Sequence, residues 1–575
     1  MFPTRKTDLT RQYLYLPGLC LLLVLLSACS LFGDASPHMV KAPANKQTYV
    51  IPQVGITDLD TLDPALAHDD ASIHAVQMLY TGLVQLNDKL EVVPQLAQSW
   101  QTDSDGLTWT FKLKPHLTFS DGTPLTSADV AYSLNRALLP ATQSTVAPLY
   151  LNIIKGASQV IAGRSASIIG TGVTTPDANT IMITTEQPAT YLLARLSMNC
   201  AYVVEKSMVT KYGAQFTDHL SQGGVSGPFR VADYKHGQSI TFSPNTHYYN
   251  ARPQLQKVTY RFYQTAQEAY KAYTNRQIDT ASVPLANYQN ARKQKDFHQV
   301  PQLWINYYTM NYLTKPFDNV KIRQAFALAI DKQAIVQNVW KGTALPTNHI
   351  LPQGMPGYNE KLTGPDQTQK LSGNPKLAQT LLKEGLKEEN IASVSDLPDI
   401  ELSYATGVPT IAQEIQATIQ QWQKVLNISV KPNPMDYNTL LDKITASSMN
   451  NQELQLWALS WIGEYPDPQD WLSYQFGKGT VNNNMNYGQN FGPTAAKQQV
   501  LQDQLTRADG LTNAGGRLQA YQQAEQQLVN DVAWLPMEQE TAIFLRTTDI
   551  VGLVDNGQNT TPPDDWAKIY RVQAG

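Results

Sequence analysis

The sequence predicts an α/β protein built from several domain-sized units. A chain of 575 residues is too long for a single hydrophobic core, and its length suggests three or four such units. From about Thr48 to the C-terminus, segments with the period of a β-strand alternate with segments that have the period of an amphipathic helix. No internal repeat and no long low-complexity segment interrupts this alternation.

The N-terminus carries the pattern of a bacterial lipoprotein signal. Basic residues at positions 5, 6 and 11 precede an apolar run over about 16–26, which is too short to span a bilayer. The run ends in LSAC at 26–29, where small residues precede the thiol of Cys29. We therefore predict a signal peptide over 1–28, diacylglycerol on Cys29, and a flexible tether over 29–47.

Cysteine content argues against a small scaffold held by disulfides. Cys20 would leave with the signal and Cys29 would carry lipid, so Cys200 remains alone and no internal disulfide can form. The net charge is −4 and no long basic run occurs, which gives no indication of nucleic-acid binding.

The segment from Ser99 to Val130 reads SWQTDSDGLTWTFKLKPHLTFSDGTPLTSADV. Alternation of apolar and polar residues over 107–114 predicts a strand with one buried face. Asp121-Gly122 predicts a turn, and Thr126 with Asp129 three residues later predicts a helix that begins with a capping box.

Further elements follow from similar patterns. We expect a helix from about 72 to 81, hairpins with turns at 177–179 and 235–237, and a periodic helix over 322–330. A helix capped by Asn374 should end at Gly385. Another helix should cover about 410–426 and be followed by a strand over 428–430. The glycine-rich stretch 223–229 has no following GKS or GKT, which excludes a P-loop and favours a tight chain crossing.

The amino-acid sequences of several of these segments resemble those of the family 5 extracellular solute-binding proteins. These are the oligopeptide- and dipeptide-binding components of bacterial ABC importers. The resemblance is carried by the segment 99–130, by Leu62-Asp63-Pro64, by GVSGPF at 224–229 and by PFDNVKIRQAFALAIDKQAIV at 316–336. Arg517, Tyr521, Ala524 and Glu525 also match a helix of that family.

The resemblance implies a two-lobed fold of the periplasmic-binding-protein type (class II, cluster C), with an extra subdomain inserted in the first lobe. We expect the first lobe at 48–84, 224–306 and 541–575, the inserted subdomain at 85–223, and the second lobe at 307–540.

The segment WALSWIGEYPDP, 457–468, resembles the family's loop that receives the amino terminus of a bound peptide. There the peptide backbone pairs with the protein backbone and a carboxylate binds the ammonium group. Glu464 stands where the family usually has aspartate, so it is the expected ammonium partner, with Trp461 and Tyr465 beside it. Asp467 is expected to be structural, and Glu464 alternatively could be a solvated loop carboxylate.

Other candidate ligand-binding residues are Tyr308 and Asn311, on the strand that enters the second lobe, and Asp70 and Ser72, before the first helix. Ordinary strand packing would explain Tyr308 and Asn311 equally well, and Ser72 could be a helix N-cap.

Two departures bear on ligand choice. Ala458 stands where the oligopeptide branch tends to carry arginine, and the loop YATGVPT, 404–410, lacks the arginine that the dipeptide branch uses for the ligand carboxylate. A dedicated dipeptide binder is therefore disfavoured, whereas longer peptides remain acceptable.

Binders of oligosaccharides, nickel and haem occur in the same family, and 10 Trp and 28 Tyr residues would supply stacking surfaces for a sugar. The clustered His68, Asp69, Asp70 and His74 match no standard metal spacing. A secreted hydrolase is a further alternative, but HExxH, GxSxG and a nucleophilic cysteine motif are missing.

The sequence thus predicts a binding protein rather than an enzyme, with no cofactor and no metal. Its expected partners are a peptide, an ABC permease with its ATPase subunits, and the outer face of the cytoplasmic membrane through the lipid anchor. We expect a monomer.

Overall fold

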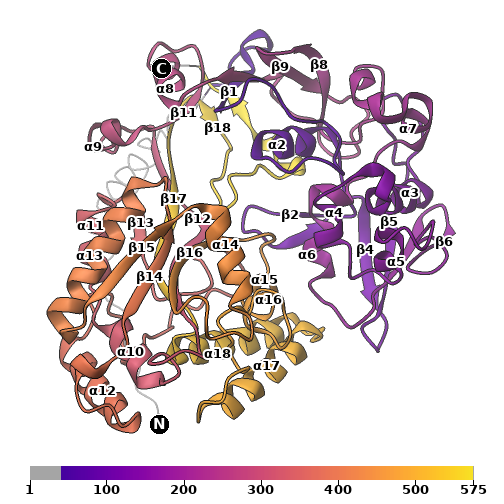
Figure 1. Ribbon diagram of the computed structural model, residues 1–575. Coiled ribbons are helices and arrows are strands. Elements are labelled where there is room, and N and C mark those ends of the chain that lie inside the picture. The colour runs from indigo at the N-terminus through magenta and orange to yellow at the C-terminus, as the bar shows by residue number, and fades with distance from the viewer. Residues whose placement is uncertain (1–39, 574–575) are drawn as a thin grey trace, which may run out of the picture.

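Three β-sheets organise the chain into two lobes and a subdomain (Figure 1). The computed structural model describes residues 40–573. The predicted signal peptide, the lipid-bearing Cys29 and most of the predicted tether lie outside the described residues. The described residues confirm the two-lobed α/β fold with an inserted subdomain, while the boundaries between these parts stay a prediction.

The first lobe is built on a four-stranded sheet of order β1-β10-β9-β8, in which β1 is parallel to β10 and the other pairs are antiparallel. Its core lies between this sheet and helix α2, with Phe229 and Phe242 fully buried. Its elements are β1 (Thr48–Val54), α2 (Asp70–Leu79), β8 (Phe229–Lys235), β9 (Ser239–Pro244), β10 (Lys257–Tyr263), α8 (Ala266–Thr274), α9 (Tyr288–Ala291), β18 (Ile550–Val551) and β19 (Tyr570–Arg571).

The inserted subdomain has its own antiparallel sheet, β4-β5-β7-β6, and its own core. Trp109, Phe111 and Leu113 of β5 point into that core, which confirms the predicted alternation. Its elements are β2 (Val84–Leu86), β3 (Val92–Pro94), β4 (Ala97–Thr102), β5 (Thr108–Leu113), α3 (Ser127–Leu138), α4 (Ala147–Tyr150), α5 (Ala157–Ile161), β6 (Val173–Asp177), β7 (Thr180–Thr184), α6 (Leu192–Leu196) and α7 (Lys206–Tyr212).

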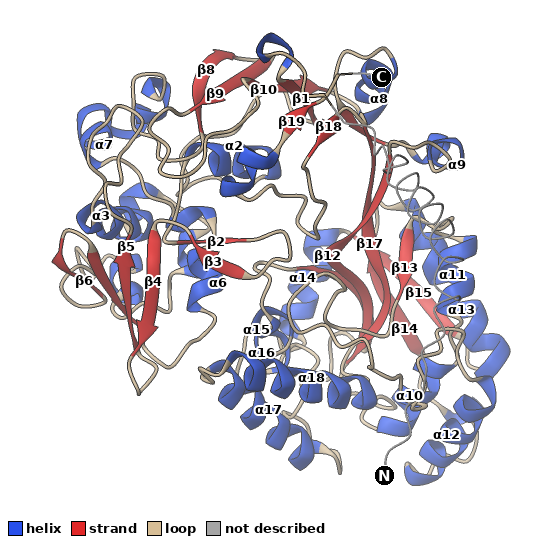
Figure 2. Cartoon of the chain, turned by 180° about the vertical axis from the view of Figure 1, so that it is seen from behind, coloured by secondary structure: helices blue, strands red, loops and turns tan. Residues whose placement is uncertain are grey.

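The second lobe surrounds a seven-stranded mixed sheet of order β11-β17-β12-β16-β14-β15, with β13 added to β17. Helices cover both of its faces (Figure 2). Its strands are β11 (Thr280–Ser282), β12 (Phe297–Met310), β13 (Ala344–Pro346), β14 (Ile400–Ala405), β15 (Val430–Met435), β16 (Leu456–Ile462) and β17 (Leu535–Arg546). Its helices are α10 (Val320–Leu328), α11 (Lys332–Asn338), α12 (Pro375–Glu388), α13 (Pro409–Leu426), α14 (Tyr437–Ala446), α15 (Pro468–Trp471), α16 (Ser473–Phe476), α17 (Ala495–Asp509) and α18 (Ala514–Asp531).

Two long strands connect the lobes. β17 runs from the second lobe to β11, beside β1 of the first lobe (Figure 1). The pairing of β12 with β17 shifts register between Pro301 and Ile305. An interruption of the ladder at this point leaves the strands locally free to bend.

Local predictions were confirmed where short-range chemistry decides the structure. Thr126 and Asp129 form the capping box, Gly122 takes a positive φ of 92° in its turn, and both predicted hairpins are present. Two predictions were wrong. The strand after α13 covers Val430–Met435 rather than 428–430, since Asn427 adopts a left-handed conformation and ends the helix before the chain extends.

Helix α12 was also predicted to end at Gly385, yet it continues to Glu388. The glycine serves packing instead. A Cβ at Gly385 would lie 2.6 Å from Cγ1 of Ile322 on α10, so the absence of a side chain lets the two helices approach closely.

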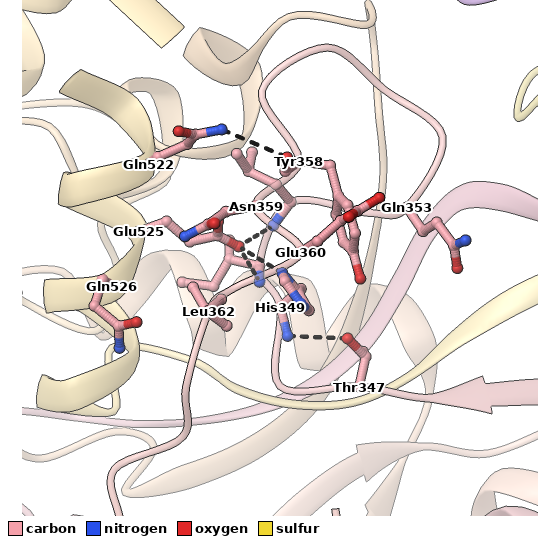
Figure 3. Close-up of polar contacts among 12 residues, drawn as sticks. Thr347, His349, Gln353, Tyr358, Asn359, Glu360, Leu362, Gln522, Glu525 and Gln526 are labelled. Atoms are coloured by element: carbon pink, nitrogen blue, oxygen red, sulfur yellow. Dashed lines mark hydrogen bonds and ion pairs between the residues drawn. The ribbon is translucent and has the colours of Figure 1, made fainter. Parts of the chain in front are cut away.

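Glu525 of α18 fixes the long connection that follows β13 (Figure 3). Its buried carboxylate accepts hydrogen bonds from the backbone N–H groups of Ile350 and Leu351, at 3.0 and 2.9 Å. The His349 ring lies 3.6 Å away and packs against Tyr358. One buried acid thus orders a loop whose backbone amides would otherwise lack partners.

Of residues 40–573, no helix is both long enough and apolar enough to cross a membrane.

Replacing Gly385 with alanine should destabilise the second lobe, because the added methyl group would overlap Ile322. We expect a loss of about 1–3 kcal/mol in the free energy of unfolding, measured by urea titration. Gly515→Ala on the open face near the start of α18 is the matched control, and it should be neutral or stabilising by up to about 1 kcal/mol. Equal stability of the two variants would contradict the packing role.

Candidate functional site

The candidate site is the segment that follows β16, where the second lobe meets the inserted subdomain (Figure 1). We name residues 463–467 the anchor loop. β16 is parallel to β14, and β14 is parallel to β15, so the carboxyl ends of these strands share one edge of the sheet. Ligands of open α/β sheets bind outside the carboxyl ends of strands, which makes this edge the expected binding wall of the second lobe.

Glu464 connects the two parts of the molecule. Its Oε2 accepts a hydrogen bond of 2.7 Å from the hydroxyl of Tyr150, at the end of α4 in the subdomain. Burial and the neighbouring Glu464 charge raise the pKa of Tyr150, so its hydroxyl keeps its proton and remains a donor. Glu464 itself is only half-buried. Within residues 40–573 no lysine, arginine or histidine forms an ion pair with it.

Asp470 lies directly behind the anchor loop. Its Oδ2 accepts from the backbone N–H of Glu464 at 3.0 Å and from the indole Nε1 of Trp461 at 3.2 Å. Its other oxygen has no hydrogen-bond partner among the described residues, and the side chain is fully buried. Burial first, and the charge of Glu464 second, raise the pKa of Asp470 well above its usual value. A protonated Asp470 would place no second charge behind the anchor loop.

Tyr465 fastens the anchor loop to the subdomain. Its ring is buried in the subdomain's core, and its hydroxyl accepts a 3.0 Å hydrogen bond from Arg195 of α6. The Arg195 guanidinium lies over the rings of Tyr191 and Tyr465, 4.9 and 5.1 Å from their centroids. Two aromatic rings and the Tyr465 hydroxyl therefore hold this cation, and it forms no ion pair with Glu464.

Asp467 and Arg517 form a buried, bidentate ion pair with nitrogen-to-oxygen distances of 2.8 and 2.6 Å. Asp467 also caps α15 by accepting from the Gln469 amide at 2.9 Å. Both contacts agree with the structural role expected for Asp467. Together they attach the anchor loop to α18.

The remaining sequence candidates are not brought to the anchor loop. Tyr308 is buried and its hydroxyl donates to Glu414, while Asn311 is fully buried at the opposite end of β12 and donates to backbone oxygens of 450 and 454. Ser72 is also fully buried and accepts from the Thr61 amide. It is not the helix N-cap, because Asp69 takes that position.

Asp70 is the first residue of α2 in the first lobe. It lines a cavity of about 490 Å³ together with His74, Phe544, Arg546 and Val554. Burial lowers the pKa of His74, and the neighbouring charges of Asp70 and Asp69 oppose that shift. This wall faces the crossing strands and is separate from Glu464.

Sequence reasoning missed three residues of the site: Tyr150, Arg195 and Asp470. Tyr150 and Arg195 come from short subdomain helices more than 250 residues before the anchor loop, and only the fold brings them there. Asp470 could have been predicted from the sequence, because it stands in the same loop-helix segment as Glu464 and Asp467.

Comparison with known proteins gives one consistent result. The model of the family described as bacterial extracellular solute-binding proteins, family 5 Middle, matches residues 91–483. The oligopeptide-binding protein OppA of Bacillus subtilis is 28% identical over 501 residues, which cover 86% of this chain and 89% of OppA.

Two solved structures of the murein tripeptide-binding protein MppA are similar, both at 26% identity and over 93% of this chain. The structure described as the unliganded open form has a TM-score of 0.79 and is covered to 99%. The other, from Escherichia coli, has a TM-score of 0.62 and is covered to 100%. The arrangement of the lobes described here is therefore similar to that of an open binding protein.

Replacing Asp470 with asparagine should flatten the dependence of stability on pH. Because its folded-state pKa is raised, the native protein binds more protons than the unfolded chain, and stability contributed by this proton is lost as pH rises above about 4. Asparagine keeps an acceptor for Trp461 and Glu464 but has no proton to lose. We expect the melting temperature of Asp470→Asn to fall less than that of the wild type between about pH 4 and 8, measured by calorimetry.

Asp467→Asn is the control, and for this variant we expect a loss of stability at neutral pH. It removes the charge that pairs with buried Arg517, and it should destabilise the protein by about 3–5 kcal/mol at neutral pH. Equal pH profiles of wild type and Asp470→Asn would contradict the assignment of the buried proton to Asp470.

Proposed function

Because the chain belongs to the family 5 bacterial extracellular solute-binding proteins, we propose that it is the lipid-anchored binding protein of an ABC importer that captures oligopeptides between its lobes. B. subtilis OppA, a relative, is an oligopeptide-binding protein. In this proposal the ligand is released to the permease unchanged, and the protein is not an enzyme. Attachment through Cys29 would hold it at the outer face of the cytoplasmic membrane, in the periplasm or at the cell surface.

The observation that carries the proposal is the half-buried carboxylate of Glu464, which lies at the junction of lobe and subdomain and has a hydroxyl partner but, among residues 40–573, no cationic partner. A peptide ammonium group supplies that cation. The charge-assisted hydrogen bond would strengthen when the closing lobes exclude water. The rest of the peptide would lie extended along the carboxyl edge of the sheet, where backbone pairing supplies affinity without selecting side chains.

Closure in this scheme is a shift of population. The lobes adopt an arrangement similar to an open form, and the register break between Pro301 and Ile305 gives the crossing strands a place to bend. A ligand shifts the equilibrium only by as much as it binds the closed form better than the open form. A peptide that contacts both Glu464 and the first-lobe wall at Asp70 would satisfy that condition.

Removing the ammonium charge should weaken binding. We expect a peptide and its N-acetylated form to differ by about 2 kcal/mol or more, roughly thirtyfold in Kd, because acetylation leaves Glu464 without a cation in the closed cleft. Calorimetric titration with both peptides measures this difference. Glu464→Gln should reduce the difference to a small factor while the free peptide loses affinity.

Glu401→Gln serves as a control, since Glu401 is an exposed residue of β14. It should preserve the full difference between the free and acetylated peptides. If wild-type protein binds both peptides equally, Glu464 is not the ammonium partner. Mass spectrometry of the peptide after prolonged incubation should find it intact, and a cleaved peptide would contradict the absence of catalysis.

Cys29→Ser should abolish membrane attachment, because serine cannot receive the thioether-linked lipid. In fractionated bacterial cells we expect the wild type in the membrane pellet and the variant in the soluble fraction or the medium. A variant that still sediments with membranes would rule out Cys29 as the site of the anchor.

A further inference from the structure

Five basic side chains gather at one outer corner of the first lobe. They belong to helix α8 and to the segment around α9, which lie next to each other in both views (Figure 1 and Figure 2). All five are exposed, and within residues 40–573 none of them forms an ion pair: Lys271, Arg276, Arg292, Lys293 and Lys295. We name these five residues the basic corner.

Two contacts join α8 to the segment around α9. Tyr270 of α8 and Ala291 of α9 share one small hydrophobic core. The hydroxyl of Tyr273, in the last turn of α8, donates a hydrogen bond to Asp296. This bond places Lys295 beside the end of α8. The exposed sides of the two segments therefore form one continuous surface.

The acidic residues of the same stretch already have partners. Between positions 264 and 297 they are Glu268, Asp279 and Asp296. Glu268 accepts from the backbone amide at the start of α8, Asp279 pairs with Arg571, and Asp296 accepts from Tyr273. The corner is thus positive on a chain whose net charge is −4. An exposed cluster of one sign attracts a surface that carries a dense charge of the opposite sign.

The described part of the chain begins beside this corner. The backbone oxygen of Val40 accepts from the Gln573 amide at 2.8 Å, and the Ala42 amide donates to the Arg571 carbonyl at 2.9 Å. The side chain of Arg571 in turn pairs with Asp279, which follows α8. Hydrogen bonds therefore hold Val40 on the same side of the first lobe as α8.

Only a short connection separates this point from the predicted lipid. Cys29 stands 11 residues before Val40, and a chain of that length reaches at most about 40 Å when fully extended. A lipid on Cys29 would therefore keep this side of the first lobe close to the bilayer. A surface of anionic lipids attracts lysine and arginine side chains that come within a Debye length, about 10 Å.

We propose that the basic corner docks on the anionic phosphate headgroups of the membrane that holds the lipid, and that it turns the first lobe toward the bilayer. The inference rests on the proposed function, because it assumes that Cys29 carries the lipid. An acidic segment of a partner protein would match the same charge, but the short connection to Cys29 favours the bilayer. The attraction is weak by itself since salt screens it, and the lipid makes it effective by keeping the corner near the headgroups.

The test is sedimentation with lipid vesicles of the mature chain from residue 29 on, produced without its signal and carrying Cys29→Ser. At about 20 mM salt we expect this lipid-free protein to bind vesicles of phosphatidylglycerol but not of phosphatidylcholine, and at about 500 mM salt to bind neither. The triple variant Lys271→Gln, Lys293→Gln and Lys295→Gln should lower the partition coefficient on phosphatidylglycerol at least about tenfold. All three lysines are exposed, so its melting temperature should stay that of the parent protein.

Three exposed lysines of the second lobe supply the matched control. Lys383 and Lys387 of α12 and Lys424 of α13 form no ion pair within residues 40–573. The variant Lys383→Gln, Lys387→Gln and Lys424→Gln changes the net charge by the same amount, and its partition coefficient should fall by less than about twofold. An equal loss in both triple variants would overturn the inference, because net charge alone would then explain the attraction.

The source of the attraction is tested by the lipids themselves. If the parent protein fails to bind phosphatidylglycerol at low salt, the bilayer is not the partner, and an acidic protein surface takes its place. The lipidated wild type extracted from bacterial membranes should bind both kinds of vesicle at either salt concentration. Its failure to bind phosphatidylcholine would contradict the proposed anchor on which the inference rests, whereas the lipid-free protein tests the corner alone.

Discussion

The buried ion pair between Asp467 and Arg517 is the interaction on which the site depends. The anchor loop follows a strand end and has little regular structure of its own, so its position must come from side-chain contacts. Asp467 makes two such contacts, one with the guanidinium of Arg517 and one with the first turn of α15. A bidentate pair constrains both distance and orientation, and breaking it would leave a charge without a partner in a buried place. Because the pair joins the loop to α18, Glu464 is held by the body of the second lobe.

The electrostatics of the loop follow from this packing. Two carboxyl groups, Glu464 and Asp470, meet at the anchor loop, where Asp470 accepts from the Glu464 amide. The buried cation Arg195 is engaged with aromatic rings and the Tyr465 hydroxyl. Two adjacent charges would repel each other, and burial decides which group gives up its charge. Asp470 is the fully buried one, and its burial together with the charge of Glu464 raises the pKa of Asp470 well above its usual value. In the proposed function, the Glu464 carboxylate is the group that pairs with the single ammonium group of the ligand.

The sequence predicted what depends on short-range chemistry. The capping box at Thr126, the period-two strand over 108–113 and the glycine turn at Gly122 need only a few neighbouring residues, and all three are present. The role of Gly385 was predicted wrongly because the glycine allows close packing against Ile322 on another helix. No local sequence pattern reveals such a contact. For the same reason the anchor loop was found from its sequence, whereas Tyr150 and Arg195 were not. Tyr308 lies on β12 as predicted, and Asn311 directly follows that strand. The twist and depth of the sheet decide which of its residues reach a ligand, and both of these residues are buried away from the anchor loop.

Trp304 links the two halves of the proposed mechanism. It stands within the register break of the crossing strands, between Pro301 and Ile305, and it is also the cross-strand partner of Ile462, two residues before Glu464. A side chain placed there by a ligand would contact the segment that must bend when the lobes approach each other. Only contacts that differ between the open and closed forms can shift that equilibrium. If the strands bend at this register break on closure, as the proposed function implies, binding energy gained at Trp304 would favour the closed form more than the same energy gained on a rigid part of either lobe.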